Sequence, residues 1–243
     1  REIEEIGLFL TSVGLKSGER ATILGYNSIS WFSAALAIQG VGGVMVPIYP
    51  SSTSEQAAYV VAHSDARVLF VDSATSLRKV FESWDEYSDV LRIVALNDTL
   101  DPVGVLGKMR AEGNEVPRFA DVDARFVTWT RARAIGHALH QESPDLFMRL
   151  MDSVSLEQPG LMLYTSGTTG RPKGVPLTHR NIATNGRDWL QCNAPMLEEG
   201  YVDLLWLPLS HIFGFGEACL GNTLGFVTYW TDPLNVMDKL QEV

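Results

Sequence analysis

Short apolar runs alternate with helix-length segments through residues 1–96, and this alternation restricts the fold more than any other feature of the chain. Chains with this alternation form parallel sheets covered by helices. The runs are continuously apolar, as is typical of strands that are buried on both faces. The predicted strands are residues 20–25, 44–48, 67–72 and 91–96. We therefore predict an α/β fold with parallel-rich sheets covered by helices.

Apolar residues at helical spacing predict the segments around these strands. A first helix contains Ile3 and Val13 and ends at Gly14. Ser28 is a predicted N-cap, because its hydroxyl can accept a backbone hydrogen bond at a helix start. The helices that follow are predicted at residues 28–39, 54–63 and 75–84.

An uncharged stretch runs from Ala21 to Ser54. A membrane-spanning helix needs about 20 predominantly apolar residues, whereas this stretch is interrupted by polar residues, glycines and prolines. The interrupting residues include Asn27, Ser28, Gln39, Gly42, Pro47 and Pro50. A buried helix followed by a buried strand fits this composition better.

The middle of the chain, residues 97–158, is more charged and less regular. We expect a helical or irregular surface excursion there, with two or three short helices, the clearest at residues 131–140. In residues 159–243 the α/β pattern returns, with strands predicted at 161–164, 175–178, 204–207 and 225–230 and a helix from 178 or 179 to about 192. The predicted organisation is thus a first α/β part (1–96), the excursion (97–158) and a second α/β part (159–243).

The balance of charge is acidic, with 29 Asp and Glu against 19 Lys and Arg and a formal net charge of −10. Such a surface disfavours non-specific binding to nucleic acid or anionic lipid. An anionic ligand therefore needs a local basic feature. One window has it: between Gln158 and Arg187 there is no Asp or Glu, and its basic residues are Arg171, Lys173, Arg180 and Arg187.

Residues 164–175 of this window read Tyr-Thr-Ser-Gly-Thr-Thr-Gly-Arg-Pro-Lys-Gly-Val. Glycines allow the backbone to approach a ligand closely, and successive backbone N–H groups in such a turn form a nest that binds anions. Four hydroxyl side chains and Lys173 add further donors. The segment follows a predicted strand, so we predict a phosphate-binding loop rather than a flexible surface hairpin.

Other glycine motifs fit less well. A Walker-type loop has four residues between its glycines and a lysine directly after the second, whereas Gly167 and Gly170 are two residues apart and Arg171-Pro172 precedes Lys173. Gly214-Phe-Gly216 lacks the third glycine of a dinucleotide fingerprint. His137 and His140 lie one helical turn apart, but no Cys or carboxylate accompanies them in the sequence, so we expect a solvated helix face rather than a metal site.

The loop sequence, followed by Leu-Thr-His-Arg-Asn at 177–181, resembles the signature of the adenylate-forming superfamily, which includes acyl-CoA synthetases. Leu-Pro-Leu-Ser-His-Ile-Phe-Gly at 207–214 resembles the next motif of that family, and residues 41–72 resemble an upstream structural block. Pro-Ile-Tyr-Pro-Ser-Ser at 47–52 and the long insert before the loop are most similar to the long-chain fatty acid–CoA ligase branch.

The resemblance implies a large N-terminal AMP-binding domain and a reaction in two steps. A carboxylic acid attacks Mg-ATP to give acyl-AMP, and coenzyme A then accepts the acyl group. In that reading Thr165 lies near the metal, Lys173 and Thr165 are the catalytic residues, and phosphate contacts come from one run of the loop. The predicted nucleotide-binding residues are Thr165, Ser166, Gly167, Thr168, Thr169, Gly170, Lys173 and Gly174.

The same resemblance places His211 beside the acyl-adenylate and makes Phe213 or Phe215 a candidate gate of the acyl tunnel. From the residues alone, a packed or capping histidine is the preferred interpretation of His211, and the two phenylalanines are equally interpretable as core aromatics. The predicted cofactor and substrates are Mg²⁺, ATP, coenzyme A and a fatty acid, with no nucleic acid as partner.

Several parts of that family are missing from these residues. The Tyr-Gly-x-Thr-Glu and Thr-Gly-Asp blocks and the C-terminal domain are absent, and residue 1 is Arg rather than Met. We therefore expect an incomplete N-terminal domain, natural or deliberately trimmed, that does not make acyl-AMP by itself. Two alternatives remain open: an acyl-AMP ligase that loads a carrier protein, and a nucleotide-binding module without catalysis.

The expected location is the cytoplasm, with at most peripheral membrane contact, since no targeting segment opens the chain and no basic amphipathic helix is visible. Cys192 and Cys219 have no metal-like spacing and are expected to be buried thiols. Oligomeric state and acyl chain length are not readable from these residues.

Overall fold

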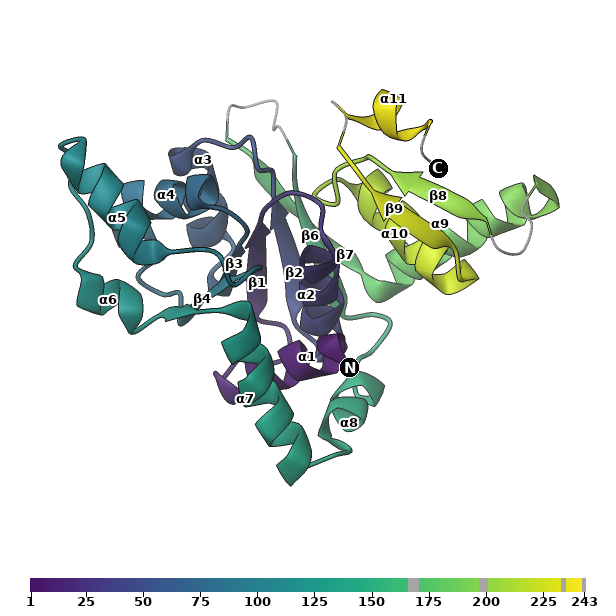
Figure 1. Ribbon diagram of the computed structural model, residues 1–243. Coiled ribbons are helices and arrows are strands. Elements are labelled where there is room, and N and C mark those ends of the chain that lie inside the picture. The colour runs from purple at the N-terminus through teal and green to yellow at the C-terminus, as the bar shows by residue number, and fades with distance from the viewer. Residues whose placement is uncertain (166–170, 197–200, 233–234, 242–243) are drawn as a thin grey trace.

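A computed structural model describes residues 1–165, 171–196, 201–232 and 235–241 (Figure 1). The strands are β1 Arg20–Leu24, β2 Val44–Ile48, β3 Ala66–Val71, β4 Arg92–Ala95, β5 Phe126–Val127, β6 Pro159–Thr165, β7 Lys173–Thr178, β8 Val202–Leu205 and β9 Val227–Trp230. The α-helices are α1 Glu2–Ser12, α2 Ile29–Gly40, α3 Ser54–His63, α4 Ala74–Glu82, α5 Pro102–Ala111, α6 Phe119–Asp123, α7 Trp129–Glu142, α8 Leu146–Asp152, α9 His179–Asn193, α10 Ile212–Leu224 and α11 Val236–Lys239. Short 3₁₀ helices lie at η1 Trp84–Tyr87 and η2 Ala194–Met196.

Seven strands form one sheet in the order β5-β4-β3-β1-β2-β6-β7. All neighbouring strands run parallel except β6 and β7, which form an antiparallel hairpin at one edge. All five residues of β2 are buried, as expected for a strand covered on both faces. The predicted α/β fold with a parallel-rich, helix-covered sheet is confirmed.

Two layers of helices cover the sheet because successive strand residues point to opposite faces. On one face, Ile23 and Phe70 pack with the buried side chains of α1, α2, α7, α8 and α10. On the other face, Leu24 and Leu69 pack with those of α3, α4, α5 and α6. Each apolar strand thus contributes to two separate cores, which is why its sequence shows no polar alternation.

The order of the strands reverses at β1, which lies between β2 and β3. The chain leaves β1 toward β2 and then crosses back to β3, so the connections after β1 and β3 run in opposite directions. In open parallel sheets the crevice at such a reversal is a common ligand position. In this chain the side chain of Asp72, which follows β3, reaches across that crevice to the segment after β1. Its Oδ2 accepts a hydrogen bond from the Tyr26 N–H at 2.8 Å.

Helix starts agree with the capping residues in the sequence. The hydroxyl of Ser28 accepts from the backbone N–H of Trp31, and Thr178 and Asn181 form a reciprocal capping box at the start of α9. The predicted N-cap Ser28 is confirmed, and the helix that was predicted to begin at 178 or 179 begins at His179 with Thr178 as its N-cap. For α3, the N-cap is Thr53, one residue before the predicted start.

Residues 97–158 contain more helices than the two or three short ones that the sequence predicted. The structure has four helices there, α5 to α8, and β5 adds a strand to the main sheet. The clearest of them, α7, packs tightly on α1: a Cβ at Gly136 would lie 1.7 Å from the Glu5 carbonyl oxygen. The buried side chains of Trp129 and Ala132 belong to the core of that face. The charged residues of α7 suggested an exposed helix, but several of them form ion pairs with α1 at the contact between the two helices.

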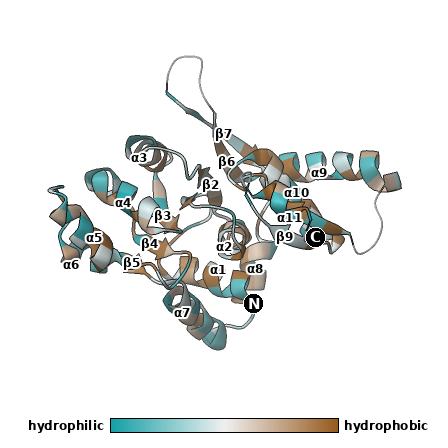
Figure 2. Cartoon of the chain, turned by 45° about the horizontal axis from the view of Figure 1, so that its top comes forward, coloured by the Kyte–Doolittle hydropathy of each residue, from teal (hydrophilic) through white to brown (hydrophobic). Residues whose placement is uncertain are grey.

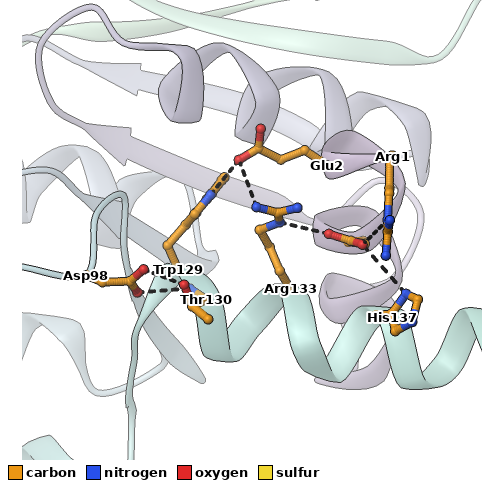
Figure 3. Close-up of polar contacts among 8 residues, drawn as sticks. Arg1, Glu2, Asp98, Trp129, Thr130, Arg133 and His137 are labelled. Atoms are coloured by element: carbon orange, nitrogen blue, oxygen red, sulfur yellow. Dashed lines mark hydrogen bonds and ion pairs between the residues drawn. The ribbon is translucent and has the colours of Figure 1, made fainter.

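Figure 3 shows the pairs that Arg133 and His137 of α7 form with α1. The carboxylate of Glu5 is buried between α1 and α7 and contacts Arg133 at 2.8 Å and Arg1 at 2.9 Å. His137 lies 3.6 Å from the same carboxylate, and His140 lies 2.9 Å from Glu4. The expected solvated helix face is confirmed only in part: the side chains of His137 and His140 are 41% and 32% exposed, but both face carboxylates of α1, which no local pattern in the sequence reveals.

The second α/β part holds a two-stranded parallel sheet, β8–β9, which α10 contacts. The predicted strand at 204–207 lies two residues earlier, at Val202–Leu205, and α10 was not predicted at all. One cysteine prediction was also wrong, because Cys192 is exposed on α9. Among the described residues, no helix has the length and apolarity that crossing a membrane requires.

Candidate functional site

The β6–β7 hairpin carries the predicted phosphate loop. Its two strands pair in antiparallel register, and the last registered pair before the connecting segment is Thr165 opposite Lys173. The predicted contacts Ser166, Gly167, Thr168, Thr169 and Gly170 lie outside the described residues. Figures 1 and 2 show this hairpin at the edge of the main sheet, between the side with α3 and the side with α9 and α10.

Thr165 and Lys173 are both exposed at the open end of the hairpin. Directly opposed residues of an antiparallel pair have Cβ atoms about 4.5–5.5 Å apart, so a hydroxyl and an ammonium group are presented side by side. Lys173 forms no ion pair with any residue that the structure describes. A free ammonium group beside a hydroxyl is suited to an anionic ligand such as phosphate.

The other basic residues of the acid-free window are engaged elsewhere. Arg180 pairs with Glu157, and Arg187 pairs with Asp188 at 3.2 Å. The guanidinium of Arg171 lies 5.6 Å from the centroid of the Tyr59 ring. Arg171 and Lys173 are thus the two charges of the predicted basic island that form no ion pair with the described residues, and of these Lys173 lies opposite Thr165.

Gly174 has a packing reason for being glycine. A Cβ at this position would lie 3.0 Å from the Met162 sulfur and 3.3 Å from the Tyr164 ring. A side chain there would push against the neighbouring strand. Close packing within the hairpin therefore accounts for this glycine, in addition to the ligand contact predicted from the sequence.

The motif at 207–214 forms the turn before α10. His211 is the N-cap of this helix, and its Nδ1 accepts from the Phe213 N–H at 3.2 Å. The two rings stack with their centroids 5.8 Å apart and their planes 6° apart. His211 is exposed and Phe213 is 71% exposed. Capping fixes the orientation of this histidine, and its outer edge faces open space.

Phe215 lies apart from that exposed pair. It is 1% exposed, and its ring packs 6.4 Å from Trp31 and 6.2 Å from Phe32, measured between centroids. Of the three residues predicted to contact substrate, the structure brings His211 and Phe213 together at the start of α10 and places Phe215 in the core.

Asn27 is a residue that the sequence analysis did not assign to the site. Its Nδ2 donates to the Leu207 carbonyl at 2.9 Å, and its Oδ1 accepts from the Leu209 N–H at 2.8 Å. In the first turn of α10, a Cβ at Gly214 would lie 2.3 Å from the Pro208 carbonyl oxygen. The turn that leads to His211 is therefore fixed to the end of β1. A polar residue in the short loop between a buried strand and the next helix is the signal that could have indicated this role.

Among the described residues, one pair of cavities near the sheet is lined by residues other than Thr165, Lys173 and His211. The larger, of about 840 Å³, lies beside the hairpin and is lined by Tyr59, Arg171 and Pro172 together with the carboxylates of Glu55, Glu82, Asp85, Glu86 and Glu115. So many carboxylates disfavour a phosphate there. The smaller, of about 620 Å³, lies between α4 and α5 next to Asp72 and Asn97.

Comparison with known proteins identifies the family and the fold that this chain shares. Human long-chain-fatty-acid–CoA ligase ACSBG1 is 30% identical over 206 residues, which cover 82% of this chain and 25% of that protein. The solved long-chain-fatty-acid–CoA ligase FadD1 of Archaeoglobus fulgidus matches with a TM-score of 0.65 at 22% identity, over 99% of this chain and 41% of that one. ATP-bound MatB of Rhodopseudomonas palustris matches with a TM-score of 0.60 at 19% identity, over 100% of this chain and 42% of that one.

The chain therefore spans a quarter of the length of its human relative and about two fifths of these solved chains. The structural matches show a shared fold, and the resemblance that the motifs indicated is confirmed by the family model described as AMP-binding enzyme, which matches residues 1–242. Because that match includes all but the last residue, the chain belongs to the AMP-binding enzyme family.

Proposed function

We propose that this chain is part of an acid–thiol ligase that activates a long-chain fatty acid with ATP and transfers the acyl group to coenzyme A. The observation that carries the proposal is the pairing of Thr165 with Lys173 at the open end of the hairpin. The names of the human and archaeal relatives support a long-chain fatty acid as substrate, and ATP-bound MatB supports ATP.

The first step joins a carboxylate oxygen of the acid to the α-phosphorus of ATP and breaks the bond to the bridging oxygen of pyrophosphate. Negative charge moves onto the departing pyrophosphate. A cation that is already in place stabilises that charge without reorganising during the reaction. Lys173, which is exposed and free of ion pairs within the described part of the chain, is assigned this role.

In the second step the sulfur of coenzyme A bonds to the acyl carbon and AMP leaves. The exposed edge of His211 is assigned to the wall of the acyl-adenylate pocket, because its Nδ1 is already used by the Phe213 N–H. Phe213 is the better candidate for a gate of the acyl tunnel, since it is 71% exposed whereas Phe215 is held among Trp31 and Phe32.

Thr165 is assigned to the Mg²⁺ ion that accompanies ATP. Mg²⁺ takes six oxygen ligands and usually keeps several waters, with phosphates completing the set. Within the described ranges there is no cluster of three His, Cys, Asp or Glu side chains that could hold a metal. The exposed Thr165 hydroxyl therefore fits Mg²⁺ as a single protein oxygen beside the nucleotide's phosphates, where the ion would offset their charge.

We further propose a cytoplasmic protein with at most peripheral membrane contact. Its formal net charge of −10 disfavours anionic lipid surfaces. Its two cysteines are free, with one exposed and one half-buried, which is compatible with a reducing compartment.

The test is ATP–pyrophosphate exchange by the full-length protein with a long-chain fatty acid. We expect Lys173→Ala to lower the exchange rate by about 100-fold, the usual cost of removing one group that stabilises developing charge. The matched control is Arg187→Ala, which removes a cation of the same window that is paired with Asp188. An unchanged rate for Lys173→Ala would refute the role of the lysine. Acyl-AMP that is passed to a carrier protein and not to coenzyme A would favour the carrier-protein alternative.

A further inference from the structure

The open end of the β6–β7 hairpin receives little support from the main sheet. Among the described strands, β7 lies at the edge of the sheet and pairs with β6 alone. β6 is joined to β2 by one registered pair, Met45 with Leu161. Thr165 lies four residues beyond Leu161, which is about 13 Å along a strand at 3.3 Å per residue. Sheet pairing alone therefore does not fix the position of Thr165 and Lys173.

Helix α3 supplies the missing contacts through two side chains that lie one turn apart. The Tyr59 hydroxyl donates to the Pro172 carbonyl at 3.0 Å. The Nδ1 atom of His63 lies 2.8 Å from the Tyr164 hydroxyl. The first contact holds the hairpin after residues 166–170, and the second holds it before them, so both ends of the predicted phosphate segment are fixed to the same helix.

The aromatic rings reinforce these two hydrogen bonds. The Tyr164 ring lies edge-on to Tyr59, with centroids 6.3 Å apart, and edge-on to His63, with centroids 5.7 Å apart. Such edge-to-face pairs add to the energy of simple burial. The guanidinium of Arg171, the residue before Pro172, lies over the Tyr59 ring at 5.6 Å from its centroid.

The Tyr164 hydroxyl is neutral over the physiological range, because burial raises the pKa of Tyr164 to about 12. It can therefore donate to a neutral His63 or accept from a protonated one. The contact between α3 and β6 does not depend on one protonation state of the histidine.

We propose that Tyr59 and His63 are positioning residues for the nucleotide: by holding Pro172 and Tyr164, they fix the neighbouring residues Lys173 and Thr165, to which the proposed function assigns the ATP phosphates and their metal ion. This inference rests on the proposed function of the hairpin. Neither side chain touches Thr165 or Lys173 in the structure, so each acts through the hairpin and not as a ligand of ATP.

The first test uses Tyr59→Phe in the full-length protein, which removes one hydroxyl and keeps the ring. Because a single neutral hydrogen bond is worth about 1 kcal/mol, we expect ATP to bind about fivefold more weakly. Binding of a fluorescent fatty acid should stay unchanged, and the thermal midpoint should fall by no more than about 2–4 °C, because only one hydrogen bond of the folded protein is lost. The matched control is Tyr26→Phe, because Tyr26 is exposed and its hydroxyl makes no hydrogen bond with the described residues.

The second test concerns His63 and Tyr164. His63→Ala and Tyr164→Phe should each weaken ATP binding, and the double variant should be no weaker than the worse single one, since both remove the same bond. His63→Asn keeps an acceptor near the position of Nδ1 and should restore most of the affinity. This rescue would not occur if His63 only filled space.

Either of two outcomes would overturn the inference. One is unchanged ATP affinity for both Tyr59→Phe and His63→Ala. The other is an equal loss of ATP and fatty acid binding together with a larger fall in the thermal midpoint, which marks a general packing role. A wild-type protein that binds ATP but makes no acyl-AMP would refute the proposed function and leave this inference standing, whereas one that binds no ATP would refute both.

Discussion

The side-chain amide of Asn27 donates a hydrogen bond of 2.9 Å to the carbonyl of Leu207, which lies 180 residues later in the chain. The same amide accepts a bond from the Leu209 N–H. One side chain at the end of β1 therefore satisfies two backbone groups of the turn that precedes His211. The main sheet and the start of α10 are held in a fixed relation by this contact.

Asn27→Ala should loosen this turn. Two backbone groups lose their partner in a partly buried place, which we expect to cost about 1–3 kcal/mol of unfolding free energy. In the full-length protein the KM for the acid should rise more than the KM for ATP, because the altered turn leads to His211 and not to the hairpin. The control is Asn222→Ala, an exposed asparagine of α10. Equal changes in both KM values would contradict this assignment.

Arg133→Ala should destabilise the contact between α1 and α7 shown in Figure 3. It removes the 2.8 Å partner of the buried Glu5 carboxylate and the more distant partner of Glu2 at 3.9 Å. We expect a loss of about 1–3 kcal/mol at pH 7, because Arg1 remains as a second partner of Glu5. Arg131→Ala, on the exposed side of the same helix, is the control and should change stability by less than about 0.5 kcal/mol.

The effect of Arg133→Ala should also depend on pH. Burial acts to raise the pKa of Glu5, but hydrogen bonds from Arg133 and Arg1 outweigh it, so the pKa lies below its ordinary value of 4.5. A lowered carboxyl pKa contributes stability above the ordinary value and loses it as the pH falls through the folded-state pKa. The difference between variant and wild type should therefore narrow below pH 4.5, as measured by thermal unfolding across a pH series.

The main sheet could be predicted because its strands are continuous apolar runs that only a doubly covered sheet explains. β5 could not, since two residues carry no periodicity. α10 was missed for a different reason. Its glycines disfavour a helix by about 1 kcal/mol each relative to alanine, yet one of them, Gly214, is required by the close approach of the Pro208 carbonyl. The helix α10 therefore forms because of its tertiary packing, although its local sequence has a low helix propensity.

The candidate site also has a part that the sequence predicts and a part that it does not. The hairpin and the partners Thr165 and Lys173 follow from a local motif, because adjacent strands of a hairpin are close in sequence. The supports of the site are not local: Asn27 contacts Leu207, and Tyr59 contacts Pro172 113 residues away. Only the packing of α3 and β1 against distant segments reveals these residues, and no spacing rule within the sequence indicates them.

Asp203→Asn should stabilise the protein at pH 7. Burial raises the pKa of Asp203, and its Oδ2 has no hydrogen-bond partner among the described residues. Burial also raises the pKa of the nearby Glu217, and repulsion from Asp203 adds to that shift. A raised carboxyl pKa means that the ionised form is disfavoured in the folded state, so its cost is present at pH 7 and disappears below the ordinary value of 3.8.

We expect the thermal midpoint of Asp203→Asn to rise by about 1–3 °C at pH 7, a small gain because solvent screens a half-exposed carboxylate. The gain should vanish as the pH approaches 3.8. Asp152→Asn, at an exposed position at the end of α8, should show no such gain. A stabilisation of Asp203→Asn that persists at low pH would show that charge is not its cause.

The 243-residue chain by itself should not catalyse ATP–pyrophosphate exchange. It contains the hairpin but none of the Tyr-Gly-x-Thr-Glu or Thr-Gly-Asp sequences that the family resemblance associates with the metal, adenine and ribose. Lys173 and Thr165 can hold phosphate, but the reacting carboxylate and the α-phosphate also need to be placed in line, and such placement accounts for about 7–11 kcal/mol of a barrier. The purified chain, incubated with ATP, a long-chain fatty acid and labelled pyrophosphate, should therefore give no exchange above that of a Lys173→Ala variant. Exchange at a rate that Lys173→Ala abolishes would show that these residues already form a complete adenylation site.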